Sequence, residues 1–211
     1  MDGEEDKKSS YEETLEKAKA STQKALQDAM LVFGYLAANP MRVHQKALTG
    51  LSVDGLMYAG IVFSAVFALF QALALGRLVF FFARFFGQPA FSGGANYFKL
   101  FFVSLAPVLA LFLSFLGTGF VADKKVNSKL ALYATGVTLF PIAALFFLFL
   151  LLGMGKLLLI FVLVFVCYCV LLTYSALYDL YNLHTRTAFL LTPVLLFVGG
   201  YLTGWLYDLL A

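Results

Sequence analysis

The stretch from Leu130 to Leu177 reads LALYATGVTLFPIAALFFLFLLLGMGKLLLIFVLVFVCYCVLLTYSAL, and its one charged residue is Lys156. An α-helix needs roughly 20 apolar residues to cross about 30 Å of hydrocarbon. Two runs of this length flank the short GMGK sequence that ends at Lys156. We therefore predict two membrane spans, 130–152 and 157–177, joined by a tight turn.

The composition of the whole chain agrees with a membrane location. Of 211 residues, 62% are hydrophobic and 13% are charged, against roughly 45–50% and about 25% in soluble domains. The mean hydropathy is +0.88. Further apolar runs lie at 55–76, 98–120 and 188–207. These features exclude an ordinary soluble domain and predict an all-α, polytopic membrane helical bundle of five transmembrane helices over 55–211.

The first 54 residues hold most of the acidic side chains and form a separate region. We expect 1–9 to be a disordered acidic tail, and 10–54 to form amphipathic helices on the cytoplasmic side or in the interface. Ser10 and Glu13 have the spacing of a capping box, and Asn39-Pro40 ends the first helix and starts a short second one. The helix over 10–38 either packs on the membrane or the spans, or forms a coiled coil. Its candidate partner-binding residues are Tyr11, Leu15, Leu26, Met30, Phe33 and Leu36.

The basic residues are distributed unequally between the two sides of the predicted bundle. Eleven of the fifteen Lys and Arg residues fall on the side of the amino terminus and four on the other side. The positive-inside rule therefore predicts a cytoplasmic amino terminus and, after five crossings, an extracytoplasmic carboxyl terminus. The basic residues near the membrane on the cytoplasmic side would form a rim suited to anionic headgroups or an acidic partner. This predicted basic rim comprises Arg42, Lys46, Lys124, Lys125, Lys129 and Arg186.

Small residues recur at intervals of four in three of the predicted spans. Such stripes allow two helix backbones to approach closely in lipid. These stripes of small residues either pack the helices of this bundle against one another or bring two copies of the chain together. The predicted packing residues are Gly60, Ser64, Ala68, Ala72 and Gly76 in the first span, Ala106, Ala110 and Ser114 in the second, and Gly200 and Gly204 in the fifth.

Three prolines lie inside predicted spans: Pro107, Pro141 and Pro193. Each removes a backbone hydrogen bond and favours a kink. Kinked helices frame a cavity for a lipid or substrate, or have a purely structural role.

The sequence contains no pattern typical of an enzyme or a cofactor site. No Asp, Glu, Lys, Arg or His lies in the middle of a span, whereas pumps and intramembrane enzymes use such groups. The chain has no Walker loop, HExxH or GxSxG motif. We interpret His44 and His184 as interfacial residues, and Cys167 and Cys169 as small packing residues. We expect no catalytic residue, no metal, no cofactor and no nucleic-acid partner.

The order of features resembles the Yip1-domain family. The similarity covers about 39–211 and rests on Asn39-Pro40, Tyr97-Phe98-Lys99, Lys124-Lys125 and Thr138–Pro141. The acidic-Leu-Tyr-Gly-Pro motif of eukaryotic members is absent before the first span, so Rab-GTPase recognition is not carried over. Bacterial members often have an amino-terminal zinc ribbon, and here the helix over 10–38 stands in its place. The resemblance implies a bacterial-type, non-enzymatic membrane adaptor, in a bacterial plasma membrane rather than the Golgi or endoplasmic reticulum.

We therefore expect a membrane scaffold that recruits or positions a membrane or cytoplasmic protein, or a second copy of itself, at the cytoplasmic face of the lipid bilayer. The alternative is a transporter or lipid-handling subunit with a hydrophobic cavity at the proline-bearing helices. A closed bundle with an exposed amino-terminal helix would favour the adaptor. A lipid-filled cavity at the level of the prolines would favour the alternative.

Overall fold

A computed structural model describes residues 2–85, 97–121, 127–153 and 156–210 of the chain. Over these ranges the protein is all helical, with no strand. Five of its helical segments are long and apolar enough to cross a membrane: Val53–Leu78, Tyr97–Phe120, Ser128–Leu152, Ile160–Asp179 and Thr185–Leu209. The predicted fold class, an all-α bundle with five apolar spanning helices, is confirmed, and the chain is an integral multi-pass membrane protein.

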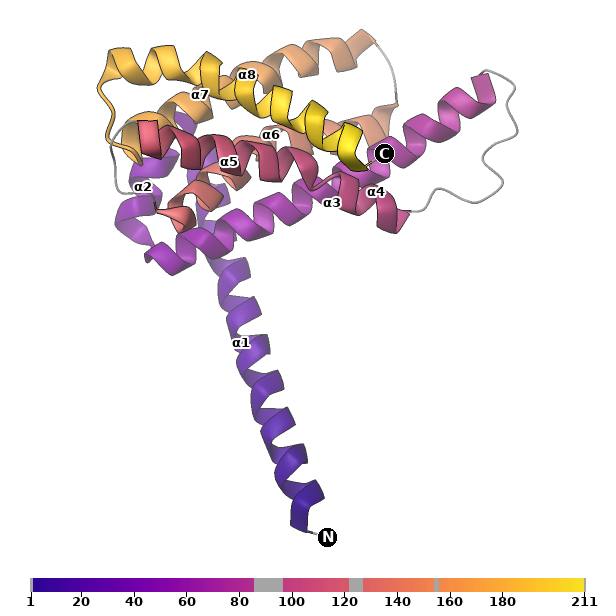
Figure 1. Cartoon of the computed structure of the whole chain (residues 1–211), viewed down its shortest axis with the longest axis vertical. Helices are drawn as coiled ribbons and strands as arrows, with labels where there is room; N and C mark the ends of the chain where they lie inside the picture. The colour runs from indigo at the N-terminus through magenta and orange to yellow at the C-terminus, as the bar shows by residue number, and fades with distance from the viewer. Residues whose placement is uncertain (1, 86–96, 122–126, 154–155, 211) are drawn as a thin grey trace.

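The helices follow one another along the chain as Figure 1 labels them. They are α1 (Asp2–Ala38), the 3₁₀ turn η1 (Pro40–Arg42), α2 (Val43–Gly50), α3 (Val53–Phe85), α4 (Tyr97–Val103), α5 (Ala106–Val121), α6 (Ser128–Leu152), α7 (Lys156–Asp179) and α8 (Thr185–Leu210). The helix α1 begins at Asp2, although 1–9 was expected to be a disordered tail. An acidic sequence favours the positive end of a helix dipole, which gives a physical reason for the longer helix.

The helix α6 lies at the centre of the bundle and contacts α3, α5 and α7. The outermost span is α8, which packs on α5 and α7. Two clusters of buried side chains hold these helices together. One joins α3, α5, α6, α7 and α8, and the other joins α1, α2, α3, α6 and α7. The amino-terminal helices are therefore packed on the membrane domain through the second cluster.

The second predicted span is interrupted in the structure. Helix α4 ends at Val103 and α5 begins at Ala106, with Ser104 and Leu105 between them. Pro107 follows at once and has no N–H to donate to the carbonyl of Val103. The hydroxyl of Ser104 donates to the carbonyl of Leu100, at 2.7 Å, and that carbonyl also accepts the backbone N–H of Ser104. Pro141 and Pro193, by contrast, lie within the continuous helices α6 and α8.

The start of α6 is set by Asn127. Its side-chain oxygen accepts hydrogen bonds from the backbone N–H groups of Lys129, at 3.0 Å, and Leu130, at 3.4 Å. These are donors that a helix leaves unpaired at its amino end. This end of α6 lies at the same end of the bundle as α2 and the α7–α8 connection (Figure 1).

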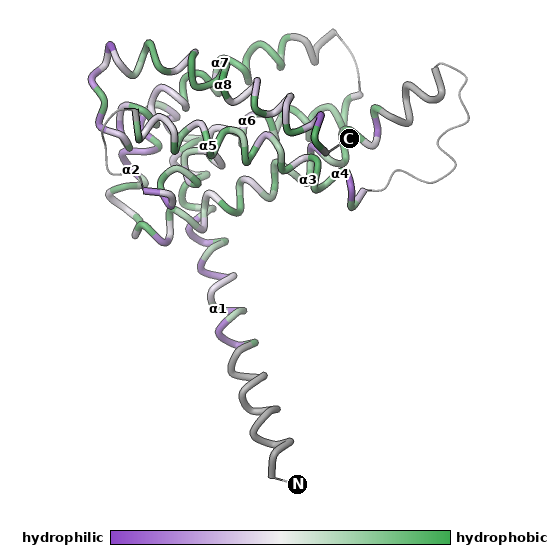
Figure 2. The backbone as a smooth tube through the Cα atoms, in the orientation of Figure 1, coloured by the Kyte–Doolittle hydropathy of each residue, from purple (hydrophilic) through white to green (hydrophobic). Residues whose placement is uncertain are grey.

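The helix α1 leaves the bundle as a long single helix (Figure 1). At 37 residues it is about 55 Å long. The coloured part of α1 mixes hydrophilic and hydrophobic residues, whereas the bundle is largely hydrophobic (Figure 2). The place where this mixed helix joins the apolar bundle is the most distinctive feature of the fold.

Candidate functional site

The helix α1 is anchored in the bundle by one face near its carboxyl end. Ala29, Val32 and Leu36 recur at helical spacing and are 2%, 0% and 3% exposed. They pack in the cluster that includes Leu56 and Ala59 of α3. The residues before them, from Leu15 to Gln27, are exposed except for the half-buried Ala25. The helix therefore has a fixed base and an uncovered projecting part.

The predicted partner-binding residues divide between these two parts. Leu15, Leu26, Met30 and Phe33 are exposed. Leu36 is buried, so it anchors the helix and is not available to a partner. The side chain of Tyr11 lies outside the described residues.

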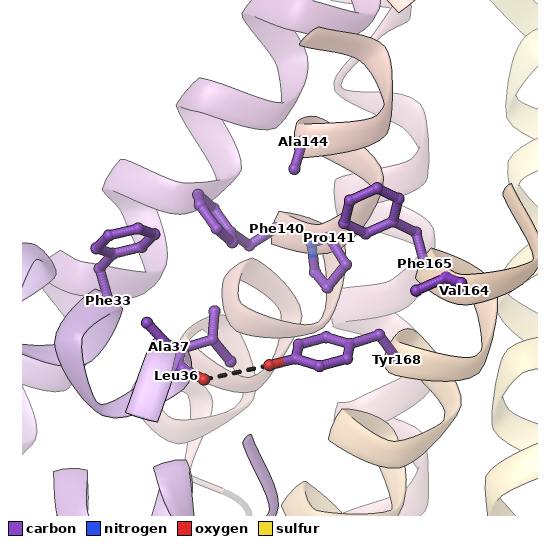
Figure 3. Close-up of a pocket in the computed structure, with 9 residues that line it drawn as sticks. All are labelled: Phe33, Leu36, Ala37, Phe140, Pro141, Ala144, Val164, Phe165 and Tyr168. Atoms are coloured by element: carbon purple, nitrogen blue, oxygen red, sulfur yellow. Dashed lines mark hydrogen bonds between the residues drawn. The ribbon is translucent and has the colours of Figure 1, made fainter. Parts of the chain in front are cut away.

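An apolar cavity lies beside the base of α1, between that helix, α6 and α7 (Figure 3). Its volume is about 240 Å³. Phe33 meets Phe140 edge to face, with ring centroids 5.6 Å apart, and Pro141 contributes to the wall. The hydroxyl of Tyr168 donates to the carbonyl of Leu36 at 3.2 Å (Figure 3). The bond fixes the last turn of α1 to the middle of α7.

His44 lies at this junction, fully buried, and not at an exposed interface as its sequence context predicted. Its Nε2 donates to the carbonyl of Leu172 at 3.2 Å, and its ring stands edge-on to Tyr133 with centroids 5.4 Å apart. Burial lowers the pKa of His44 from 6.5 to about 4, although the bond to Leu172 opposes the shift. The histidine is therefore neutral at physiological pH and helps to pack α2 against α6 and α7.

Three buried polar atoms at this end of the bundle have no hydrogen-bond partner in the part of the chain that the structure describes. They are Asp28 Oδ2, His44 Nδ1 and the hydroxyl of Tyr133. No group of three His, Cys, Asp or Glu side chains that could hold a metal ion occurs among the described residues.

The small residues of α3 face the interior of the bundle. Gly60, Ser64, Ala68, Ala72 and Gly76 are all buried. A Cβ at Gly60 would lie 2.6 Å from the carbonyl oxygen of Leu132, and a Cβ at Gly136 would lie 2.3 Å from that of Gly60. The backbones of α3 and α6 therefore touch at a Gly60–Gly136 crossing. Gly136 was missed in the sequence, where it is a lone glycine in an apolar run.

The stripe on α5, Ala106, Ala110 and Ser114, is also buried. It contacts α8 through Gly199, where an added Cβ would meet Leu111 and Ser114 at 3.4 and 3.5 Å. The predicted pair Gly200 and Gly204 is exposed, with no neighbouring atom within 4 Å of an added Cβ. The packing glycine of α8 is therefore Gly199, one position before the predicted pair.

The predicted basic rim is partly described. Arg42, Lys46, Lys129 and Arg186 are exposed, and Lys124 and Lys125 lie outside the described residues. Lys129 pairs with Asp54, at the start of α3. Lys46 lies 6.0 Å from the centroid of the Tyr35 ring. Two of the four described rim residues, Lys129 and Lys46, are therefore engaged by neighbouring side chains.

Comparison with protein-family models, with curated proteins and with solved structures gives no match to this chain.

Truncating the anchor of α1 should weaken the fold. We expect Leu36→Ala to lower the free energy of unfolding by about 2 kcal/mol or more, because it leaves a hole where Leu36 packs. Leu31→Ala removes the same atoms from a side chain that is 49% exposed and should cost less than about 0.5 kcal/mol. Thermal unfolding of the detergent-solubilised variants measures both. Equal losses would show that Leu36 does not anchor the helix.

Proposed function

We propose that this chain is a non-enzymatic integral membrane adaptor that recruits or positions a partner protein. The observation that carries the proposal is the architecture of α1. Three buried side chains and the bond from Tyr168 hold its base in the bundle. The part before that base projects as an exposed helix. A helix held in this way presents the same surface to a partner without a loss of entropy on ordering.

The projecting part favours a protein partner over a lipid surface. Glu16, Lys17, Lys19 and Lys24 are exposed in a helix whose polar residues continue around it. A membrane-bound helix instead has one broad apolar face. Leu15 and Leu26 are isolated apolar contacts among these charges. Such a surface suits a polar, helical or charged partner in water.

The Yip1-like order of sequence features supports the same function, a membrane adaptor. We place the amino terminus in the cytoplasm, on the side that carries most Lys and Arg residues. The partner is then a cytoplasmic protein, or the cytoplasmic part of a membrane protein, in a bacterial plasma membrane.

The test is capture of the partner by full-length protein beside a variant that lacks residues 2–24. This deletion keeps Ala29, Val32 and Leu36, so the base of α1 stays in the bundle. Photo-cross-linkers at Lys19 and Lys24 would report contact directly, with one at Phe197, which is 75% exposed on α8, as the matched control. We expect a protein cross-linked from positions 19 and 24 that the deletion variant does not capture. The proposal is wrong if both forms capture the same proteins and positions 19 and 24 yield none.

A transporter or lipid-handling subunit is the second candidate. It is favoured by apolar cavities beside two of the three span prolines, one at Pro141 and one at Pro193. Flux of a lipid analogue across proteoliposomes that contain the purified chain would support this candidate. It predicts that the deletion of residues 2–24 leaves that flux unchanged.

A further inference from the structure

An open apolar groove lies between α7 and α8, where the two helices pack side by side. Its volume is about 450 Å³. The wall consists of Met41 from η1, Val170, Leu171 and Tyr174 from α7, and Phe189, Thr192 and Pro193 from α8. A second hollow of about 370 Å³ shares Tyr174 and Phe189 with it and continues to Thr185 and Arg186. Together they form one groove with an apolar floor and a cationic mouth.

The depth of the groove fits one leaflet of a bilayer. Arg186 is the second residue of α8, at the interfacial end of that span. Pro193 lies two turns further along the helix, which is about 10 Å deeper. A leaflet has about 15 Å of hydrocarbon, half the thickness of the core. A lipid chain in the groove would therefore have its headgroup beside Arg186.

The mouth carries a positive charge that pairs with no carboxylate of the described residues. Arg186 is exposed and forms no ion pair with any residue of the described ranges. Lys129, at the same end of the bundle, is paired with Asp54. Among the described residues, Asp179 ends α7, and its Oδ2 lies 3.0 Å from the hydroxyl of Ser175. That hydroxyl also lies 3.1 Å from the carbonyl of Met41, a residue of η1 that lines the groove. Asp179 is therefore engaged by Ser175 and forms no ion pair with Arg186.

The mouth is held in place by the connection between α7 and α8. The hydroxyl of Tyr181 donates to the carbonyl of Phe115 at 3.1 Å, and the two rings stack. Asn182 has a φ of 49°, a left-handed conformation that asparagine tolerates at the end of a helix. These contacts fix the first turn of α8, which carries Arg186, so the groove does not need to form around its ligand.

We propose that this groove binds one acyl chain of an anionic phospholipid, whose phosphate pairs with Arg186. The lipid that surrounds any membrane protein needs neither a groove about 10 Å deep nor a cation at its mouth that pairs with no described carboxylate. A guanidinium is well suited to a phosphate because it donates two parallel hydrogen bonds. The groove does not include α1, so the result of the lipid-binding test does not depend on the proposed adaptor function.

The test uses lipid quenching of a tryptophan placed in the groove. The variant carries Phe189→Trp together with Trp205→Phe, which removes the native tryptophan. It is reconstituted in nanodiscs of phosphatidylcholine that contain brominated phosphatidylglycerol or, separately, brominated phosphatidylcholine. We expect phosphatidylglycerol to bind about 5-fold more tightly than phosphatidylcholine, the preference that one basic residue gives near a membrane surface. Native mass spectrometry of the unmodified protein should show the same preference without any substitution.

Three further variants make the test specific. Arg186→Gln should abolish the preference and Arg186→Lys should keep most of it. Lys46→Gln removes the same charge at the same end of the bundle, beside Tyr35 rather than the groove, and should change nothing. The proposal fails if the two lipids quench equally, or if Arg186→Gln keeps the preference. It also fails if the tryptophan introduced at position 189 is shielded from both lipids and a photo-cross-linker at the same position links two copies of the chain.

Discussion

Gly136→Ala is expected to lower the free energy of unfolding by about 3 kcal/mol, the upper part of the range for an overpacked site. The new methyl group would lie 2.3 Å from the carbonyl oxygen of Gly60, and within 2.9 Å of its Cα and carbonyl carbon. These are backbone atoms, so no side-chain rotation relieves the clash, and α3 must move away from α6. Thermal and denaturant unfolding in detergent would measure the loss.

The matched control is Gly200→Ala, an identical substitution in another span. No atom lies within 4 Å of a Cβ at Gly200, so we expect its stability to be unchanged or slightly higher, because alanine favours a helix. Gly60→Ala should behave like Gly136→Ala, since its Cβ would lie 2.6 Å from the Cα of Tyr133. A small effect at Gly136, equal to that at Gly200, would contradict the close crossing of α3 and α6.

The spans could be predicted from the sequence because the constraint on them is local. A helix in lipid must satisfy its own backbone and be apolar over a fixed length, and Leu130–Leu177 shows this without reference to any other part of the chain. The interruption between α4 and α5 also has a local cause, because Pro107 has no N–H to continue the helix. The stripe of small residues from Gly60 to Gly76 indicated which face of α3 is buried, because a regular period of four marks one side of a helix.

The partners of these residues could not be predicted in this way. Gly136 has no regular small neighbours that mark it as the residue opposite Gly60. The pair Gly200 and Gly204 matches a known packing motif, yet Gly199 makes the contact with α5, because the orientation of α8 depends on the helices beside it. The groove between α7 and α8 likewise depends on how those helices pair. His44 stands among polar residues in the sequence, and its burial arises only when α2 packs against α6 and α7.

Acidification should destabilise the protein through His44. Its pKa is about 4 in the folded protein, against an ordinary value of 6.5 for an exposed histidine, so the unfolded chain binds the proton first as the pH falls. The stabilising free energy that neutral His44 contributes to the fold is complete above pH 6.5. It is lost as the pH falls from 6.5 to 4. A tenfold difference in proton affinity is worth about 1.4 kcal/mol, so the total loss is about 3 kcal/mol. Between pH 7.5 and 5.5, unfolding experiments should record a loss of about 1.4 kcal/mol.

Two variants separate this effect from the titration of other groups. His44→Gln keeps a donor for the carbonyl of Leu172 but binds no proton, so its stability should be lower at pH 7.5 and nearly independent of pH down to 5.5. His184 is the other histidine of the chain and is exposed, so His184→Gln should keep the wild-type dependence. If His44→Gln kept the wild-type slope, the pH dependence would come from another group.

Because His44 packs α2 against the spans beside the base of α1, the same acidification should loosen that base first. Cleavage by trypsin after Lys24 should then accelerate at pH 5.5 in the wild-type protein and not in His44→Gln.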